Sequence, residues 1–174
     1  MRNNIGKLTK IALTCAIMCI AANIYVPLAV PVTLQTLVLY FSLLLFGAMP
    51  TLTAVGLYLV LGAIGLPVFS GFSGGIGRLL DASGGYMIGM LLAVLLWWLL
   101  DKALPDMRNR SVLLSSVTLL LIYIIGSLWY ALVYLGGAEH IPEALLVGVL
   151  PFIIPDALKI WVAHLLAKRL KNVI

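Results

Sequence analysis

The chain has 174 residues, of which 63 % are hydrophobic and only 10 % are charged. Its mean hydropathy of +1.17 excludes an ordinary water-soluble domain and indicates a membrane protein. The formal net charge of +5 could suggest a nucleic-acid partner, but the positions of the charges along the chain give it a different explanation.

Six apolar segments follow one another along the chain, and a helix of about 17 to 25 apolar residues crosses a bilayer. They cover residues 8–26, 33–49, 51–66, 84–100, 112–135 and 144–167. Prolines 27, 31, 50 and 67 mark breaks between them, because proline lacks a backbone donor and disrupts helices. The segments lack the alternating pattern of a membrane β-barrel. We therefore expect an all-α membrane protein with six transmembrane helices in one domain, residues 1–174.

Lysine and arginine concentrate in alternate connections between these segments. Nine of the eleven lie in the N-terminal, middle and C-terminal polar segments: Arg2, Lys7, Lys10, Lys102, Arg108, Arg110, Lys168, Arg169 and Lys171. The other connections hold Arg78 and the acidic Glu139 and Glu143, whereas Lys159 lies within the last segment. The positive-inside rule then predicts that both termini are cytoplasmic and that the chain resides in the bacterial cytoplasmic membrane. This bias explains the basic charge without nucleic acid.

Two ionisable residues fall inside the last apolar segment, in the stretch IIPDALKIWVAH. Asp156 and Lys159 are three apart and share one helix face, where they could simply neutralise each other. An ionisable residue in a span costs about 2.5–3.5 kcal/mol and suggests function. Because Pro155 favours a first helical turn, we expect a helix from there to Lys171, with both charges at the rim of an outward-facing cavity. Such a pair could bind a small molecule that carries amide-type N–H groups and a carboxylate.

The stretch GLPVFSGFSGGIG, residues 65–77, is rich in glycine and opens the longest outer connection, residues 67–83. Glycine lets a backbone approach a ligand closely, so we expect this loop to fold over the cavity and contact the ligand. Tyr86, which follows two glycines, is a further candidate pocket residue. Gln35 could cap the second helix or line the site. Arg78 could bind the ligand or form a surface pair with Asp81.

Two other patterns bear on partners and on chemistry. Ala12 and Ala16 form a small-residue face on the first helix, which is typical of close helix–helix contact in lipid. The sequence GFSG around Ser73 matches the G-x-S-G pattern of rhomboid-type intramembrane proteases, with His164 as the possible base, although the two are predicted at different depths. There is no P-loop for ATP and no Cys/His cluster at metal-ligand spacing, so we expect no cofactor and no catalysis.

Four stretches together resemble the BioY family: VPVTLQTL (30–37), GLYLVLGAIGLPVFSGFSGGIG (56–77), SGGYMIG (83–89) and GVLPFIIPDALK (148–159). Members are biotin-binding S components of energy-coupling factor (ECF) transporters. The resemblance implies a six-helix bundle with a biotin site near the outer side. It also implies as partners a transmembrane coupling protein, which the face at Ala12 and Ala16 would meet, and two ATP-binding subunits.

Carried over by residue, Asp156 and Lys159 match the family's D-x-x-K motif. The resemblance implies that Asp156 accepts the ureido N–H groups of biotin and that Lys159 binds its carboxylate. Ser73 and Gly74 match the family's third loop, which contributes to the pocket. The remaining alternatives are an S component for another vitamin such as thiamin, the protease, and a purely structural scaffold.

Overall fold

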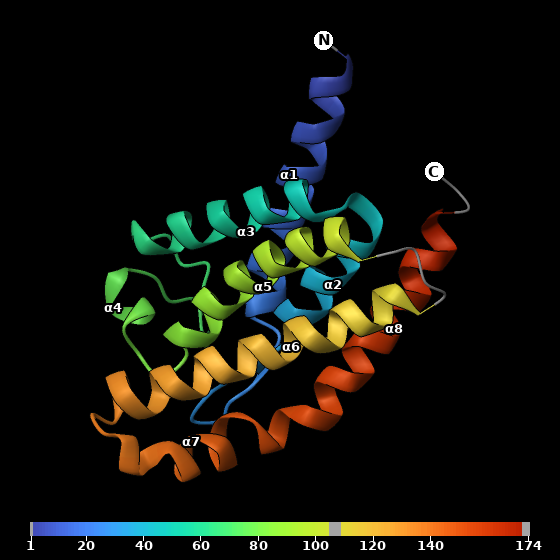
Figure 1. The fold of residues 1–174 in the computed structure, drawn as a ribbon. Coiled ribbons are helices and arrows are strands. Elements are labelled where there is room, and N and C mark those ends of the chain that lie inside the picture. Colours follow the sequence, from blue (N-terminus) through green and yellow to red (C-terminus); the bar gives the residue numbers. More distant parts are fainter. Residues whose placement is uncertain (1, 105–108, 172–174) are drawn as a thin grey trace.

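The computed structural model describes residues 2–104 and 109–171 and is almost entirely helical (Figure 1). Its α-helices are α1 (Arg2–Ala22), α2 (Gln35–Phe46), α3 (Ala48–Ala63), α4 (Ile76–Leu79), α5 (Gly84–Ala103), α6 (Arg110–Trp129), α7 (Ile141–Gly148) and α8 (Ile153–Lys171). A π-helical segment, Tyr130–Tyr134, extends α6, and 3-10 turns at Ala138–His140 and Leu150–Phe152 precede α7 and α8. The expectation of an all-helical membrane-type fold is confirmed.

All six predicted apolar segments are helical, but their lengths differ. Four stretches are long and apolar enough to cross a membrane: Asn4–Ala22, Gly84–Ala103, Arg110–Tyr134 and Ala138–Lys171. Helices α2 and α3 have only 12 and 16 residues, which at a rise of 1.5 Å per residue is shorter than a hydrocarbon core of about 30 Å. The long C-terminal stretch is interrupted, because α7 ends at Gly148 and α8 begins at Ile153.

Two prolines lie inside first turns, as was expected for Pro155, whereas Pro50 was expected to separate two helices. Pro50 is the third residue of α3, and Pro155 is the third residue of α8. The missing N–H of proline costs nothing there, because the first N–H groups of a helix have no partner within the helix. For this reason α3 begins before residue 51, and α8 begins two residues before Pro155.

The connection between α1 and α2 forms a small hairpin that the sequence did not predict. Strands β1 (Tyr25–Val26) and β2 (Val32–Thr33) are antiparallel, with Tyr25 opposite Thr33 and Val26 opposite Val32. Residues 27–31 form the tip, and Val30 within it is buried. The predicted glycine-rich loop holds the short helix α4 and a bridge between Phe69 and Ser73. These two connections lie at the same end of the bundle (Figure 1).

The helices pack mainly in three pairs, α5 with α6, α2 with α8, and α1 with α3. Glycines allow α5 to approach α6 closely. A Cβ atom on Gly85 would lie 2.1 Å from Cβ of Trp129, and one on Gly89 would lie 3.2 Å from Cα of Ile122. Close backbone approach through small residues is a common way for helices to associate in lipid.

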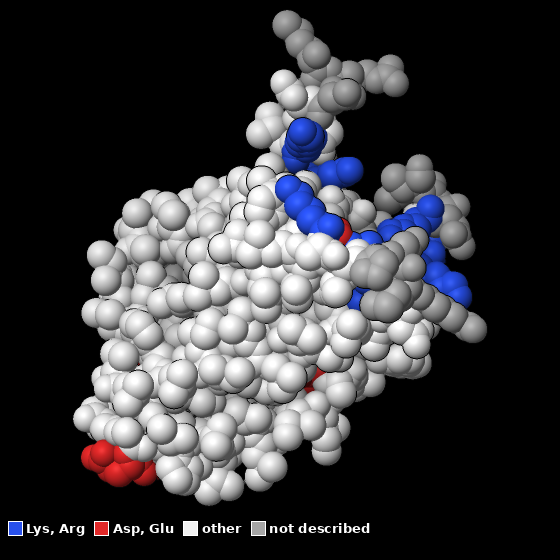
Figure 2. Space-filling view, in the orientation of Figure 1, with Lys and Arg blue, Asp and Glu red and all other residues white. Residues whose placement is uncertain are grey.

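Charged side chains divide between the two ends of the bundle (Figure 2). Lysine and arginine gather where α1 begins and α8 ends, whereas acidic side chains gather at the opposite end, over the turn that holds Glu139 and Glu143. Of the nine basic residues counted above, Arg108 and the side chain of Arg2 lie outside the described residues. The bundle therefore has one basic end, and the hairpin and glycine-rich loop lie away from it.

Candidate functional site

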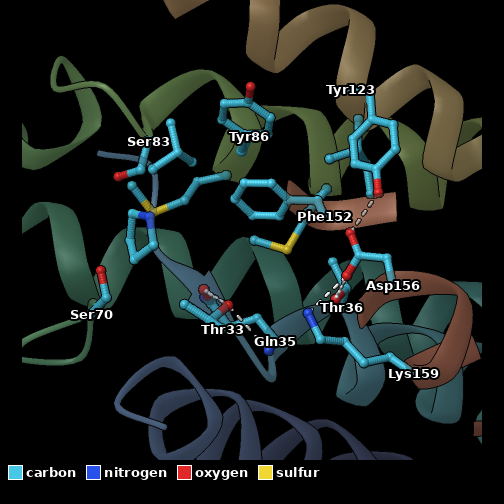
Figure 3. A pocket seen from close by; sticks show the side chains of 15 residues that line it. Thr33, Gln35, Thr36, Ser70, Ser83, Tyr86, Tyr123, Phe152, Asp156 and Lys159 are labelled. Carbon is cyan, nitrogen blue, oxygen red and sulfur yellow. Dashed lines mark hydrogen bonds and ion pairs between the residues drawn. The ribbon is translucent and has the colours of Figure 1, made fainter. Parts of the chain in front are cut away.

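A cavity lies between the ends of α2, α5, α6 and α8 and is covered by the hairpin (Figure 3). The empty space in it, including its open mouth, is about 560 Å³. Fifteen residues line it: Val30, Pro31, Thr33, Gln35, Thr36, Ser70, Ser83, Tyr86, Met87, Met90, Ile122, Tyr123, Phe152, Asp156 and Lys159. The wall is mostly apolar, with polar groups concentrated at its α2 and α8 sides.

Asp156 and Lys159, on the first two turns of α8, form a buried ion pair at the cavity wall. Lys159 Nζ lies 2.8 Å from Asp156 Oδ1, and the exposed fractions of Asp156 and Lys159 are 1 % and 7 %. The prediction that the two share a helix face is confirmed, but the expected place at an open rim is wrong. The pair is buried because α8 packs along α2 and the turn that holds Phe152 precedes it.

Two further hydroxyl groups hold the Asp156 carboxylate. Thr36 Oγ1 on α2 donates to Oδ1 at 2.9 Å, and Tyr123 Oη on α6 donates to Oδ2 at 2.9 Å. Figure 3 shows Thr36, Tyr123 and Lys159, from α2, α6 and α8, around the carboxylate. A buried charge is tolerated only when it is paired and hydrogen-bonded, and Asp156 meets both conditions. The Lys159 ammonium has three N–H donors, and one is used within the described part of the chain.

Gln35 lies at the start of α2 and is buried at the cavity wall. Its Nε2 donates to Tyr58 Oη at 2.7 Å, and its Oε1 accepts from Thr33 Oγ1 at 2.9 Å. Both ends of the amide are thus held by the protein, which fixes its orientation. Gln35 therefore lines the cavity as expected from the sequence, although it also ties the hairpin to α3.

Tyr86 lines the cavity through its ring and not through its hydroxyl. The ring is stacked on Phe152, with ring centroids 6.1 Å apart and planes 9° apart. The hydroxyl points away from the cavity (Figure 3) and is buried without a hydrogen-bond partner in the described residues. Two glycines make room for the Tyr86 side chain. A Cβ atom on Gly126 would lie 2.3 Å from the ring, and a Cβ atom on Gly148 would lie 1.8 Å from Oη.

The glycine-rich segment contributes to the site mainly through Ser70, which lines the cavity. Ser73, Arg78 and Asp81 line a second, more polar cavity above it, between this segment and the hairpin. There Arg78 pairs with Asp81, and its Nε donates to Ser73 Oγ at 2.9 Å. Gly74 is packed against backbone, because a Cβ atom there would lie 2.3 Å from the carbonyl oxygen of Leu66. Ser73 and Arg78 therefore line a different cavity from Asp156 and Lys159, although Pro31, Ser70 and Ser83 line both.

Several lining residues were not singled out in the sequence. Tyr123 and Phe152 are the main ones, because Tyr123 donates to Asp156 and Phe152 stacks on Tyr86. A tyrosine within the apolar run LLLIYIIG was a usable signal, since a hydroxyl in a span needs a partner. Val30, Met87 and Met90 carried no signal, because they look like ordinary apolar packing residues.

Ser73 and His164 do not form a nucleophile–base pair. Ser73 Oγ donates to Ser70 O at 2.8 Å and accepts from Arg78, whereas His164 Nδ1 bonds to Ile160 O of its own helix at 2.9 Å. The two side chains line different cavities. A serine protease needs the two groups in contact, so this arrangement does not favour the protease.

Comparison with known proteins identifies the family. A model of the BioY family matches residues 1–174. The chain belongs to the BioY family. A probable biotin transporter BioY of Pyrococcus horikoshii is 36 % identical over 95 % of this chain and 96 % of its own length. The biotin transporter BioY of Thermotoga maritima is 35 % identical over 95 % of this chain and 96 % of its own.

A solved structure has the same fold. It is described as the S component for biotin from an ECF-type ABC transporter, at 25 % sequence identity. The superposition gives a TM-score of 0.82 and covers 98 % of this chain and 93 % of the other. The fold of that S component therefore extends over nearly the whole chain.

Proposed function

We propose that this protein is the biotin-binding S component of an ECF transporter, which captures biotin from outside the cell. One observation carries the proposal: a buried Asp156–Lys159 ion pair, whose carboxylate also accepts two hydroxyl hydrogen bonds, faces an apolar cavity in a chain of the BioY family. In this proposal the chain crosses the bacterial cytoplasmic membrane six times, with both termini inside. The basic end of the bundle would then be cytoplasmic and the cavity would open outward.

The chemistry of biotin suits this cavity. Biotin carries a ureido group with two N–H donors and one carbonyl acceptor, an apolar sulfur ring, and a valerate tail that ends in a carboxylate. Because Asp156 and Lys159 are in direct contact, they act at a single point of the cavity. One end of an extended biotin molecule can meet both groups at once. We propose the ureido end, with Asp156 accepting an N–H and Lys159 donating to the carbonyl.

This binding mode differs from the assignment implied by the family motif, in which Lys159 binds the carboxylate. Comparison of biotin with biotin amide, which lacks the charged carboxylate, distinguishes the two. If Lys159 binds the ureido carbonyl, both ligands bind with similar affinity. If it binds the carboxylate, the amide binds more weakly, by about tenfold or more for one lost charge-assisted hydrogen bond.

The proposed partners are a transmembrane coupling protein and two ATP-binding subunits. Ala12 and Ala16 are exposed on α1, which supports their role in helix contact. The first turns of α1 also extend beyond the other helices (Figure 1). Because the sequence has no P-loop, ATP hydrolysis would have to come from the partner subunits.

Calorimetric titration of the purified protein in detergent tests the function. We expect biotin to bind with one site per chain, and thiamin in excess neither to bind nor to compete. Binding of thiamin in place of biotin would support an S component for another vitamin. Binding of neither ligand by a correctly folded protein would contradict the proposal.

A further inference from the structure

A long apolar groove runs along the outside of the bundle between α6 and α8. It encloses about 1250 Å³, including its open side, and its lining runs from Ile153 to His164 on α8 and from Val112 to Tyr123 on α6. Leu120 and Trp161 line it with exposed fractions of 59 % and 60 %. Tyr123 separates it from the cavity described above, because its side chain lines both.

The length of the groove matches one leaflet of a bilayer. From Ile153 to His164 is eleven residues, which at 1.5 Å per residue is about 16 Å. The hydrocarbon core is about 30 Å thick, so one leaflet of acyl chains is about 15 Å thick, close to the length of the groove. Its lining is nearly all apolar, which suits a hydrocarbon chain and offers little to a polar ligand.

The end of the groove nearest the basic end of the bundle carries polar and charged groups. His164 lines the groove there, and its Nε2 is buried with no hydrogen-bond partner in the described residues. A carbonyl can only accept, so Nδ1 donates its hydrogen to Ile160 O. Lys168 follows one turn later on the same helical face and is exposed.

We propose that this groove binds one acyl chain of an anionic phospholipid from the leaflet at the basic end of the bundle. The chain lies along the groove, and the phosphate meets the Lys168 ammonium. The glycerol region of the lipid then lies at the level of His164. A lysine next to an anionic membrane surface contributes about 1 kcal/mol, so the expected preference for an anionic headgroup is about fivefold.

Trp161 provides a signal inside the groove. The full chain is placed in phosphatidylcholine vesicles to which phosphatidylglycerol or phosphatidylcholine with brominated chains is added in matched amounts. Bromine quenches tryptophan fluorescence on contact, and subtraction of the signal of Trp161→Phe isolates Trp161. We expect brominated phosphatidylglycerol to quench at about one fifth of the mole fraction that brominated phosphatidylcholine requires.

Arg169 provides a matched control, because it is exposed at the same depth but lies about 100° further around α8. Lys168→Ala should abolish the preference for phosphatidylglycerol, and Arg169→Ala should keep it. Equal loss in the two variants would mean general attraction to a charged surface and would overturn the proposal, as would no preference in the unaltered chain. Absence of quenching by either lipid would mean that protein covers the groove, which also overturns it.

Discussion

The close contact between Tyr86 and Gly148 depends on a single atom, the hydroxyl oxygen of Tyr86, and this leads to a testable prediction. A Cβ atom added at residue 148 would lie only 1.8 Å from Tyr86 Oη. The Tyr86 hydroxyl is buried and has no hydrogen-bond partner in the described residues. Gly148→Ala must therefore displace the tyrosine, which is stacked on Phe152 at the cavity wall. We expect this change to lower both the stability of the protein and its affinity for biotin.

The size of the effect follows from the distances. Overpacking of this kind costs about 1–3 kcal/mol. Tyr86→Phe removes Oη, and the nearest ring atom, Cζ, then lies 3.0 Å from the added Cβ, which requires only a small shift. An unpaired buried hydroxyl itself costs about 1–3 kcal/mol, so Tyr86→Phe alone should leave stability unchanged or raise it. The double variant should recover most of the loss, with a coupling energy of about 1–2 kcal/mol between the two substitutions.

Thermal unfolding in detergent, followed by circular dichroism, measures this cycle, and a biotin titration follows the effect on the cavity. Gly126→Ala is the matched control, because its Cβ atom would meet ring carbons at 2.3 Å that phenylalanine retains. Tyr86→Phe should therefore rescue Gly148→Ala and fail to rescue Gly126→Ala. If Gly148→Ala cost the same with and without the hydroxyl, the described contact would be refuted.

Three more substitutions test the surroundings of the cavity. Tyr123→Phe removes one hydrogen bond to the Asp156 carboxylate and should lower the free energy of unfolding by about 1.5–3 kcal/mol; an unchanged melting curve would contradict that role. Gly74→Val places a side chain against the backbone of Leu66, so we expect a loss of about 1–3 kcal/mol in thermal unfolding, and reduced biotin affinity at full stability would instead support a direct ligand contact. Arg78→Gln breaks a partly exposed ion pair and should change stability by less than about 1 kcal/mol; if titration shows that it weakens the binding of biotin but not of biotin amide, Arg78 binds the carboxylate.

Local patterns in the sequence predicted the parts of the fold that depend on local chemistry. Apolar runs located the helices, and the i, i+3 spacing of Asp156 and Lys159 predicted their ion pair. The start of α3 was less accurate, because proline is as compatible with a first turn, where Pro50 lies, as with a break; the first-turn position of Pro155 was predicted correctly. The hairpin was missed because two paired residues on each side are too few to make a pattern.

The composition of the cavity depends on contacts between residues far apart in the chain. Thr36 and Tyr123 reach Asp156 across 120 and 33 positions, and nothing in their own neighbourhoods indicates that they share a partner. The glycine-rich segment illustrates the converse. Its composition suggested contact with a ligand, but the close approach at Gly74 is to Leu66.

The central claim is that the Asp156–Lys159 pair recognises biotin. The double variant Asp156→Asn, Lys159→Met tests it directly, because it removes both charges at once and leaves no unpaired charge buried. Calorimetric titration should then show biotin affinity reduced by about 100-fold or more, the equivalent of two charge-assisted hydrogen bonds, while circular dichroism shows the helical fold retained. Biotin binding at the affinity of the unaltered protein would contradict the account.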